Sequence, residues 1–212
     1  MVKNGSFTSG NTQFSSGYSY CNTANCLYPE GYYSVGTNAN FYHGNFVGRD
    51  HTTATGNFII VNGTGVLNTI VWSQNITVKP VTNYNFSAWV MTLVTSSPAK
   101  LQFQINGVTI GSVFDAPTAT QTWQNFANTW NSGASTTATI TILNQNTTLA
   151  GNDFGIDDIS FIEICGTTQP NHGPDRLLCG VGTVTVDTNV PHTATTNINW
   201  SDGSSGSGLG AP

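Results

Sequence analysis

Short runs in which apolar residues recur at every second position follow one another along most of the chain. Tyr84, Phe86 and Ala88 form one such run, and Leu101 and Phe103 belong to another. Successive side chains of a β-strand point to opposite faces, so this alternation predicts strands with one buried face. Helical spacing of apolar residues is missing from the sequence. Because turn residues separate the runs at short intervals, we predict an all-β chain folded as a β-sandwich.

Turn signals place the strands more closely. An Asn-Gly pair at positions 62–63 ends one apolar run, and another pair at 106–107 ends a second. Asn-Gly is the strongest short signal for a two-residue hairpin, so we predict a hairpin at both positions. Residues 1–57 hold Tyr, Asn, Gly and Ser with few aliphatic residues. For this part we expect a short first strand and long ordered loops.

Charged residues are scarce, and this excludes several classes of protein. They make up 7% of the chain, with 5 Lys+Arg against 10 Asp+Glu and a net charge of -5, whereas Thr (32) and Asn (24) are abundant. A protein that binds nucleic acid needs basic side chains to neutralise phosphates, so we expect no nucleic-acid partner. We expect no membrane insertion either, because no apolar run approaches the length of a membrane span.

The chain changes character near residue 165. We predict a folded module over residues 1–165, a linker over 166–174 that is rich in Thr, Gly and Pro, and a third part over 175–212. The third part holds only two or three strand signals, which are too few for a core of their own. We interpret it as a partial Ig-like repeat or a flexible tail, and the whole chain as a segment of a longer multidomain protein.

Four cysteines bear on the cellular compartment. None of them lies in a CxxC motif, which argues against zinc, and they fall into two close pairs: Cys21 with Cys26, and Cys165 with Cys179. Both intervals are short enough to close as disulfides, and disulfides persist outside the cytosol. We therefore favour an extracellular chain. The alternative is a cytosolic protein with four free thiols.

Two stretches resemble a known fold family. The opening Val2–Phe7 is similar to the "N-G-x-F-E" start of galactose-binding-like jelly-roll modules, and Gly151–Phe161 is similar to their "D-D-I" last strand. The resemblance covers residues 2–164 and implies a jelly-roll β-sandwich of the type found in carbohydrate-binding modules. The version in large surface adhesins of gliding bacteria, exported by the type 9 secretion system and followed by Ig-like repeats, is the most similar. Thr8 stands where that motif usually has Glu.

A structural calcium ion is the cofactor that we expect. Asp153, Asp157 and Asp158 lie together with no Lys or Arg nearby in the sequence, and calcium binds clustered carboxylates and carbonyls through six to eight oxygens. On a regular strand, Asp157 and Asp158 point to opposite faces, so at most one of them faces an ion. The resemblance implies ligands from the first strand, a loop and the last strand: Asn4, Gly5, Asp50, Gly56, Asp157 and Asp158. The alternative is that Asp153 caps a turn and the Asp pair is solvated.

Aromatic and amide side chains suggest a ligand face. Sugars stack on aromatic rings and accept or donate hydrogen bonds to a few placed polar groups. Trp89 lies at the opposite parity to Phe86, and Gln102 and Gln104 lie at the opposite parity to Phe103. We predict that Trp89, Gln102 and Gln104 share a concave sugar-binding platform, unless the N-terminal loops cover Trp89. The loop residues Tyr32 and Tyr42 are further ligand candidates.

These observations lead to a function without catalysis. The sequence shows no metal-binding histidine pair and no nucleophile motif, and a pair of catalytic carboxylates is disfavoured because Asp157 and Asp158 diverge on a strand. We predict an adhesion or binding module of an extracellular cell-surface protein, stabilised by calcium, whose partner is a polysaccharide or glycan surface. The alternative is a carbohydrate-binding module attached to a secreted glycoside hydrolase.

Overall fold

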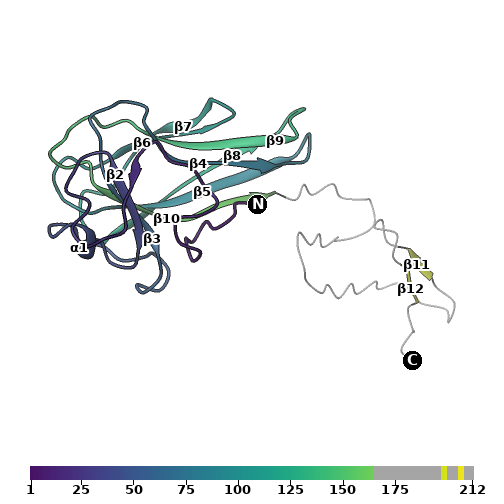
Figure 1. Ribbon diagram of the computed structural model, residues 1–212. Coiled ribbons are helices and arrows are strands. Elements are labelled where there is room, and N and C mark those ends of the chain that lie inside the picture. The colour runs from purple at the N-terminus through teal and green to yellow at the C-terminus, as the bar shows by residue number, and fades with distance from the viewer. Residues whose placement is uncertain (165–196, 200–204, 208–212) are drawn as a thin grey trace. The chain divides into compact units, whose positions relative to one another are not determined.

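The predicted all-β architecture is confirmed. A computed structural model describes residues 1–164, 197–199 and 205–207, and its regular elements are strands apart from one short helix (Figure 1). The elements are β1 (Ser19–Tyr20), β2 (Tyr32–Gly36), α1 (Ala39–Tyr42), β3 (Phe58–Asn62), β4 (Ile70–Thr77), β5 (Asn83–Thr92), β6 (Lys100–Ile105), β7 (Val108–Asp115), β8 (Trp123–Asn131), β9 (Thr137–Asn144), β10 (Phe154–Glu163), β11 (Asn197–Asn199) and β12 (Ser205–Ser207). None of the helices in the described ranges has the length and apolar character that would let it cross a membrane.

The chain divides into two units, and only the first holds the sandwich. The units are Met1–Gly166 and Thr167–Pro212. In the second unit β11 and β12 pair antiparallel. The expected linker at 166–174, the expected Ig-like character of 175–212 and the expected Cys165–Cys179 disulfide fall wholly or mostly outside the described residues.

Two sheets form the first unit. One has the strand order β1-β2-β3-β10-β5-β8 and the other has the order β4-β9-β6-β7. Apart from the short parallel pair of β1 and β2, the strand pairs of this unit are antiparallel. This is the jelly-roll β-sandwich that the sequence predicts.

The space between the sheets is filled by alternating apolar side chains. Phe103 of β6 stacks on Phe126 of β8 with 3.8 Å between the ring centroids, so the two sheets are in direct contact. Trp72 of β4 and Phe86 of β5 are fully buried in the same cluster. Burial of large aromatic side chains is the main stabilising term of such a core.

The two Asn-Gly pairs have different outcomes. Asn106 and Gly107 both have positive φ and join β6 to β7, as predicted. The prediction of a hairpin at Asn62-Gly63 is wrong, because β3 and β4 belong to different sheets. Asn62 is buried there and donates from its side chain to the Leu27 carbonyl at 2.7 Å, so it holds a loop in place instead of making a turn.

A second apolar cluster lies on the outer face of the six-stranded sheet. Its strand members include Phe58 and Ile60 of β3 and Met91 of β5, and Leu27 and Phe46 from the N-terminal loops pack over them. These loops are ordered, as predicted. They carry α1 and the predicted disulfide between Cys21 and Cys26, which is confirmed. The loops therefore cover one end of this outer face.

The N-terminal motif packs against an irregularity in β10. The register between β10 and β5 shifts between Asp157 and Ser160, which marks a β-bulge, and Asp158 has φ of 44°. The Ile159 N–H donates to the carbonyl of Gly5 at 3.0 Å. A Cβ at Gly5 would lie 2.0 Å from the Ile159 carbonyl oxygen, so only glycine permits this approach. The Asn-Gly-x-Phe sequence thus fastens the first segment to the last strand.

Replacing Gly5 tests this attachment. We expect Gly5→Ala to lower the free energy of unfolding by roughly 2 kcal/mol, because the new methyl group breaks the bond to Ile159. Gly44→Ala is the matched control, since a Cβ there meets only the Tyr28 hydroxyl at 3.4 Å. Urea unfolding measures both variants. Equal stability of the two variants would contradict the attachment.

Candidate functional site

The predicted platform of Trp89, Gln102 and Gln104 is wrong as a shared surface. Trp89 lies on β5 in the six-stranded sheet, whereas Gln102 and Gln104 lie on β6 in the four-stranded sheet. Each residue points away from the core, so the two sets occupy opposite outer faces of the sandwich. Alternation correctly predicts that these side chains point away from the core, but it carries no information about which sheet a strand joins. A ligand role for each residue stays a prediction.

Uncharged polar side chains lie beside Trp89 on the outer face of the six-stranded sheet. In β5 the side chains of Asn85, Ser87 and Trp89 share the outer face, and β8 places Asn125 opposite Trp89 and Thr129 opposite Asn85. We call this surface the Trp89 face. Asn125 and Thr129 are exposed, and the three β5 residues are half-buried. Sequence parity beside the core residue Phe126 could have identified Asn125, which our sequence analysis missed.

The rings of His51 and Trp123 border one end of the Trp89 face, and we call them its aromatic wall. The imidazole of His51 stacks on Trp89 with 3.9 Å between ring centroids and 20° between the planes. It also meets Trp123 edge-on at 5.7 Å. The loop after Arg49 therefore covers part of Trp89, which is less than the full covering by the N-terminal loops that we considered. The Asp50-His51-Thr52 stretch predicts a hydrogen-bonding loop residue at His51, and nothing in the sequence indicates that its ring stacks on Trp89.

The bulge in β10 brings two neighbouring carboxylates to the same loop. Asp157 Oδ2 accepts from the His51 backbone N–H at 2.9 Å, and Asp158 Oδ2 lies 2.8 Å from His51 Nδ1. Thr52 Oγ1 also donates to Asp158 Oδ2, at 2.6 Å. The expectation that these two side chains point to opposite faces is wrong, because the extra residue of a bulge suspends the alternation. Together they fix the ring that supports Trp89.

The carboxylates of the expected calcium site are occupied by protein hydrogen-bond donors. Asp50 Oδ1 accepts from Gly56 N–H at 2.7 Å, and Asp50 Oδ2 accepts from the N–H and hydroxyl of Thr53. Burial raises the pKa of Asp50, but these hydrogen bonds outweigh it and the pKa is lowered. Asp157 accepts at both oxygens, the second bond coming from Asp158 N–H. Of the six oxygens of Asp50, Asp157 and Asp158, five accept hydrogen bonds.

The remaining expected ligands do not complete a coordination sphere. The Gly5 carbonyl accepts from Ile159, and Asn4 Oδ1 accepts from Ser9 N–H at 2.9 Å. Gly56 presents its N–H, which is a donor and not a ligand. Among the described residues no three acidic, histidine or cysteine side chains are grouped so that they could hold a metal ion. In this arrangement the residues do not fit calcium, which needs six to eight available oxygens. The calcium ion expected from the sequence is untested, and the melting experiment with calcium and EDTA decides whether it binds.

The two tyrosine candidates occupy different environments. Tyr42 is 9% exposed, belongs to the outer apolar cluster and donates from its hydroxyl to the Val35 carbonyl. Its predicted ligand role is wrong, because the ring is used to pack α1 against the sheet. Tyr32 is half-buried and packs against the same cluster. Its ligand role stays a prediction.

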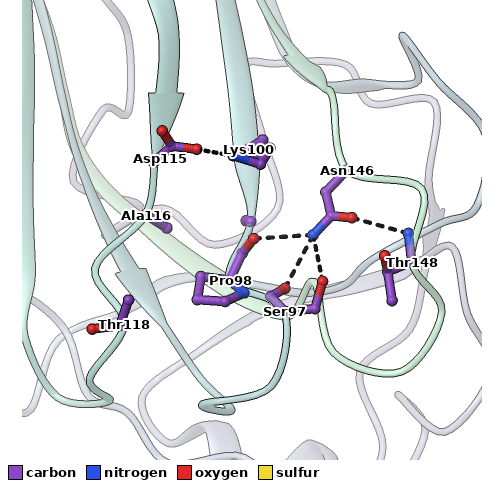
Figure 2. Close-up of a pocket in the computed structure, with 9 residues that line it drawn as sticks. Ser97, Pro98, Lys100, Asp115, Ala116, Thr118, Asn146 and Thr148 are labelled. Carbon is purple, nitrogen blue, oxygen red and sulfur yellow. Dashed lines mark hydrogen bonds and ion pairs between the residues drawn. The ribbon is translucent and has the colours of Figure 1, made fainter.

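Two cavities lie at the end of the sandwich where the loops after β5 and β9 meet. Figure 2 shows the larger, of about 420 Å³, lined by Ser97, Pro98, Ala99, Lys100, Asp115, Ala116, Thr118, Asn146 and Thr148. The amide of Asn146 donates to two backbone carbonyls and the Ser97 hydroxyl, and its oxygen accepts from Thr148. Lys100 pairs with Asp115. The hydrogen-bonding groups of this cavity are thus used to hold the loops together.

The second cavity, of about 280 Å³, contains two acidic side chains. We call it the Glu30–Asp153 cavity. Burial raises the pKa of Asp153 to about 7, the N–H of Gly63 acts in the opposite direction and the charge of Glu30 adds to the rise. Partial burial also raises the pKa of Glu30. Neither the acidic cluster nor the alternative of a turn cap at Asp153 indicates this cavity, because Glu30 lies far from Asp153 in the sequence.

Comparison with known proteins supports the fold. No family model matches the sequence, and no curated protein matches it. One similar solved structure is the N-terminal CBM22-1-CBM22-2 tandem domain of Xyn10C from Paenibacillus barcinonensis, 15% identical over 78% of this chain and 46% of that chain, with a TM-score of 0.51. Another is an arabinose-bound α-L-arabinofuranosidase, 12% identical over 81% of this chain and 27% of that chain, with a TM-score of 0.53.

A CBM4 structure is also similar, at 16% identity over 77% of this chain and all of that chain, with a TM-score of 0.46. The chain spans less than half the length of the tandem domain and about a quarter of the arabinofuranosidase. At such low identity the likeness concerns the fold. The described sandwich therefore has the jelly-roll fold that is also found in carbohydrate-binding modules.

Calcium addition tests the arrangement around Asp157. We expect excess calcium and EDTA to leave the melting temperature unchanged, because protein N–H and O–H groups already satisfy these carboxylates. Scanning calorimetry of the metal-free protein in both buffers measures it, with elemental analysis for bound metal. A rise of the melting temperature in calcium would show instead that an ion displaces these donors.

The buried carboxyl of Asp153 predicts a pH dependence of stability. Its pKa is raised from 3.8 to about 7, so between these values the folded state binds more protons than the unfolded state. Stability should therefore fall as the pH rises through this window and level off above it. Thermal melts should show a shallower fall for Asp153→Asn, and an unchanged fall for Asp115→Asn, which alters an exposed carboxylate. Identical profiles for Asp153→Asn and the unmodified protein would contradict the burial effect.

Proposed function

We propose that the jelly-roll unit is a non-catalytic module that binds neutral glycans on the Trp89 face. The observation that carries this proposal is the half-buried Trp89 ring, backed by His51 and bordered by uncharged polar side chains. A sugar presents an apolar C–H face that packs on an aromatic ring and hydroxyls that exchange hydrogen bonds. Trp89 supplies the first contact, and the side chains of Asn85 and Asn125 supply the second.

The way in which Trp89 is held favours binding. Hydrogen bonds with Asp157 and Asp158 hold His51 in place, so the aromatic wall is ordered before a ligand binds. A rigid site loses less conformational entropy on binding than a mobile one. Asn125 makes only a long hydrogen bond, 3.4 Å from its amide to the Ala88 carbonyl, and its remaining capacity is available to a ligand.

The chemistry of the face supports binding over catalysis. A glycosidase needs two carboxyl groups on either side of the scissile bond. The carboxylates nearest to Trp89 are Asp157 and Asp158, and both are held by the His51–Thr52 segment. The similar CBM22-1-CBM22-2 tandem domain consists of carbohydrate-binding modules, which supports the same conclusion.

We further propose that the module belongs to an extracellular surface protein and serves adhesion. The disulfide between Cys21 and Cys26 supports an oxidising compartment. The low content of charged residues and the abundance of Thr and Asn suit neutral partners such as polysaccharides. Attachment to a secreted glycoside hydrolase is the second candidate, and the similarity to an arabinofuranosidase chain supports it.

Binding to a panel of soluble neutral polysaccharides tests the proposal. For any polysaccharide that binds, we expect Trp89→Ala to weaken binding roughly thirtyfold, equivalent to ~2 kcal/mol for an aromatic anchor. Asn125→Ala should weaken it less, and it changes an exposed residue, so folding is preserved. Asn75→Ala is the matched control on the outer face of the four-stranded sheet.

Affinity electrophoresis screens the panel, and calorimetry measures the hits. Circular dichroism establishes that each variant is folded. Equal affinity of Trp89→Ala and the unmodified protein, or loss of binding in Asn75→Ala alone, would overturn the assignment to the Trp89 face. If no neutral polysaccharide binds, glycan recognition at this face is wrong.

A further inference from the structure

The Glu30–Asp153 cavity has features that the loop network around it does not use. Four loop segments and the end of β3 form it, and its lining includes Tyr28, Glu30, His43, Asn45 and Asp153. Its volume of about 280 Å³ is just below the ~300–1,000 Å³ of typical small-molecule sites, which suits one sugar ring better than a chain. The cavity lies at the loop end of the sandwich, where Leu93 N–H bonds to the Asp153 carbonyl.

One wall of the cavity is aromatic. Tyr28 is 57% exposed, and its ring lies 4.3 Å from the ring of His43, which in turn stacks on Phe46 at 4.2 Å. Burial lowers the pKa of His43 and so favours the neutral imidazole. Because its Nδ1 accepts from Asn45 N–H, the proton lies on Nε2, which can donate to a ligand. The wall thus offers a stacking surface and one donor.

The cavity is also lined by two carboxyl groups, Glu30 and Asp153, that accept few hydrogen bonds. Asp153 is only 6% exposed, yet within the described residues it accepts a single long hydrogen bond, 3.3 Å from Gly63 N–H to Oδ1. Glu30 forms no hydrogen bond or ion pair there. A largely buried carboxyl group with a single long hydrogen bond is costly, so a further donor supplied by a ligand would stabilise it.

No cation of the protein serves this purpose in the described part of the chain. Lys79 pairs with Glu163, Lys100 pairs with Asp115, and Arg49 donates to the Thr37 carbonyl. Lys3 lines a different pocket, beside Gln13 and Gln74. The lining of the cavity includes neither lysine nor arginine. A ligand with a positive charge and several N–H donors therefore complements this site better than a neutral or anionic one.

We propose that this cavity binds the ring of a hexosamine with a free amine, its ammonium group on Asp153 and Glu30 and its ring against Tyr28. The proposal rests on the proposed glycan-binding function and adds a second subsite for a different class of sugar. A cation beside an aromatic face gains a further favourable interaction. N-acetylation removes the charge and enlarges the ligand, so the acetylated sugar should be excluded.

Calorimetric or NMR titration with glucosamine, glucose and N-acetylglucosamine tests the proposal. Glucosamine alone should bind, and Asp153→Asn and Glu30→Gln should each weaken binding roughly tenfold, the loss expected for one charge-assisted hydrogen bond. Glu30 is exposed, so its variant folds normally. Asp115→Asn is the matched control, because it removes an exposed carboxylate of the other cavity. EDTA in all samples prevents a metal ion between the carboxylates from producing the signal.

Several results would overturn the proposal: equal binding of glucose and glucosamine, full affinity in Glu30→Gln and Asp153→Asn, or butylamine binding as tightly as glucosamine. Turnover of a nitrophenyl glucosaminide would assign the two carboxyl groups to catalysis instead. Trp89→Ala separates the two sites. Glucosamine binding that survives in Trp89→Ala supports the cavity, even where no neutral polysaccharide binds and the Trp89 face has failed its own test. Loss of glucosamine binding in Trp89→Ala contradicts it.

Discussion

The bulge in β10 is the constraint on which the rest of the unit depends. It turns Asp157 and Asp158 toward the same loop, and it presents the Ile159 N–H to the Gly5 carbonyl. One extra residue therefore joins the last strand, the first segment and the loop that carries His51. The stacking of His51 on Trp89 follows from it, so the aromatic wall of the proposed glycan site is a consequence of backbone irregularity.

Scarcity of charge determines how the few acidic residues are used. Lys79 and Lys100 are paired with exposed carboxylates, so the buried ones must find neutral donors. Asp50 and Asp157 accept hydrogen bonds from backbone N–H groups. Asp153 has a single long bond. The scarcity of basic residues therefore has two consequences. Asp157 is used to hold the His51 loop, and the carboxyl group of Asp153 in the Glu30–Asp153 cavity is left available to a ligand.

Local patterns in the sequence predicted the strands, a β-sandwich and the Cys21–Cys26 disulfide, because alternation and close cysteine spacing express local geometry. The jelly-roll fold was implied by the resemblance of Val2–Phe7 and Gly151–Phe161 to galactose-binding-like modules. The local patterns could not assign strands to sheets, so Trp89 and Gln102 were placed on one face although they lie on opposite ones. The Asn-Gly pair at 106–107 makes a hairpin, whereas tertiary contacts with Leu27 override the pair at 62–63. Glu30 and Asp153 meet only through folding, so no spacing could have revealed their cavity.

The central claim is that glycans bind to the outer face of the six-stranded sheet. An NMR titration of isotope-labelled protein with an oligosaccharide fragment of a polysaccharide that binds tests it most directly. The account predicts that the indole N–H signal of Trp89 and the side-chain amide signals of Asn85 and Asn125 shift together with increasing ligand. The amide signals of Asn75, Gln102 and Gln104 should stay in place. Shifts confined to that second group would place the ligand on the four-stranded sheet and contradict the account.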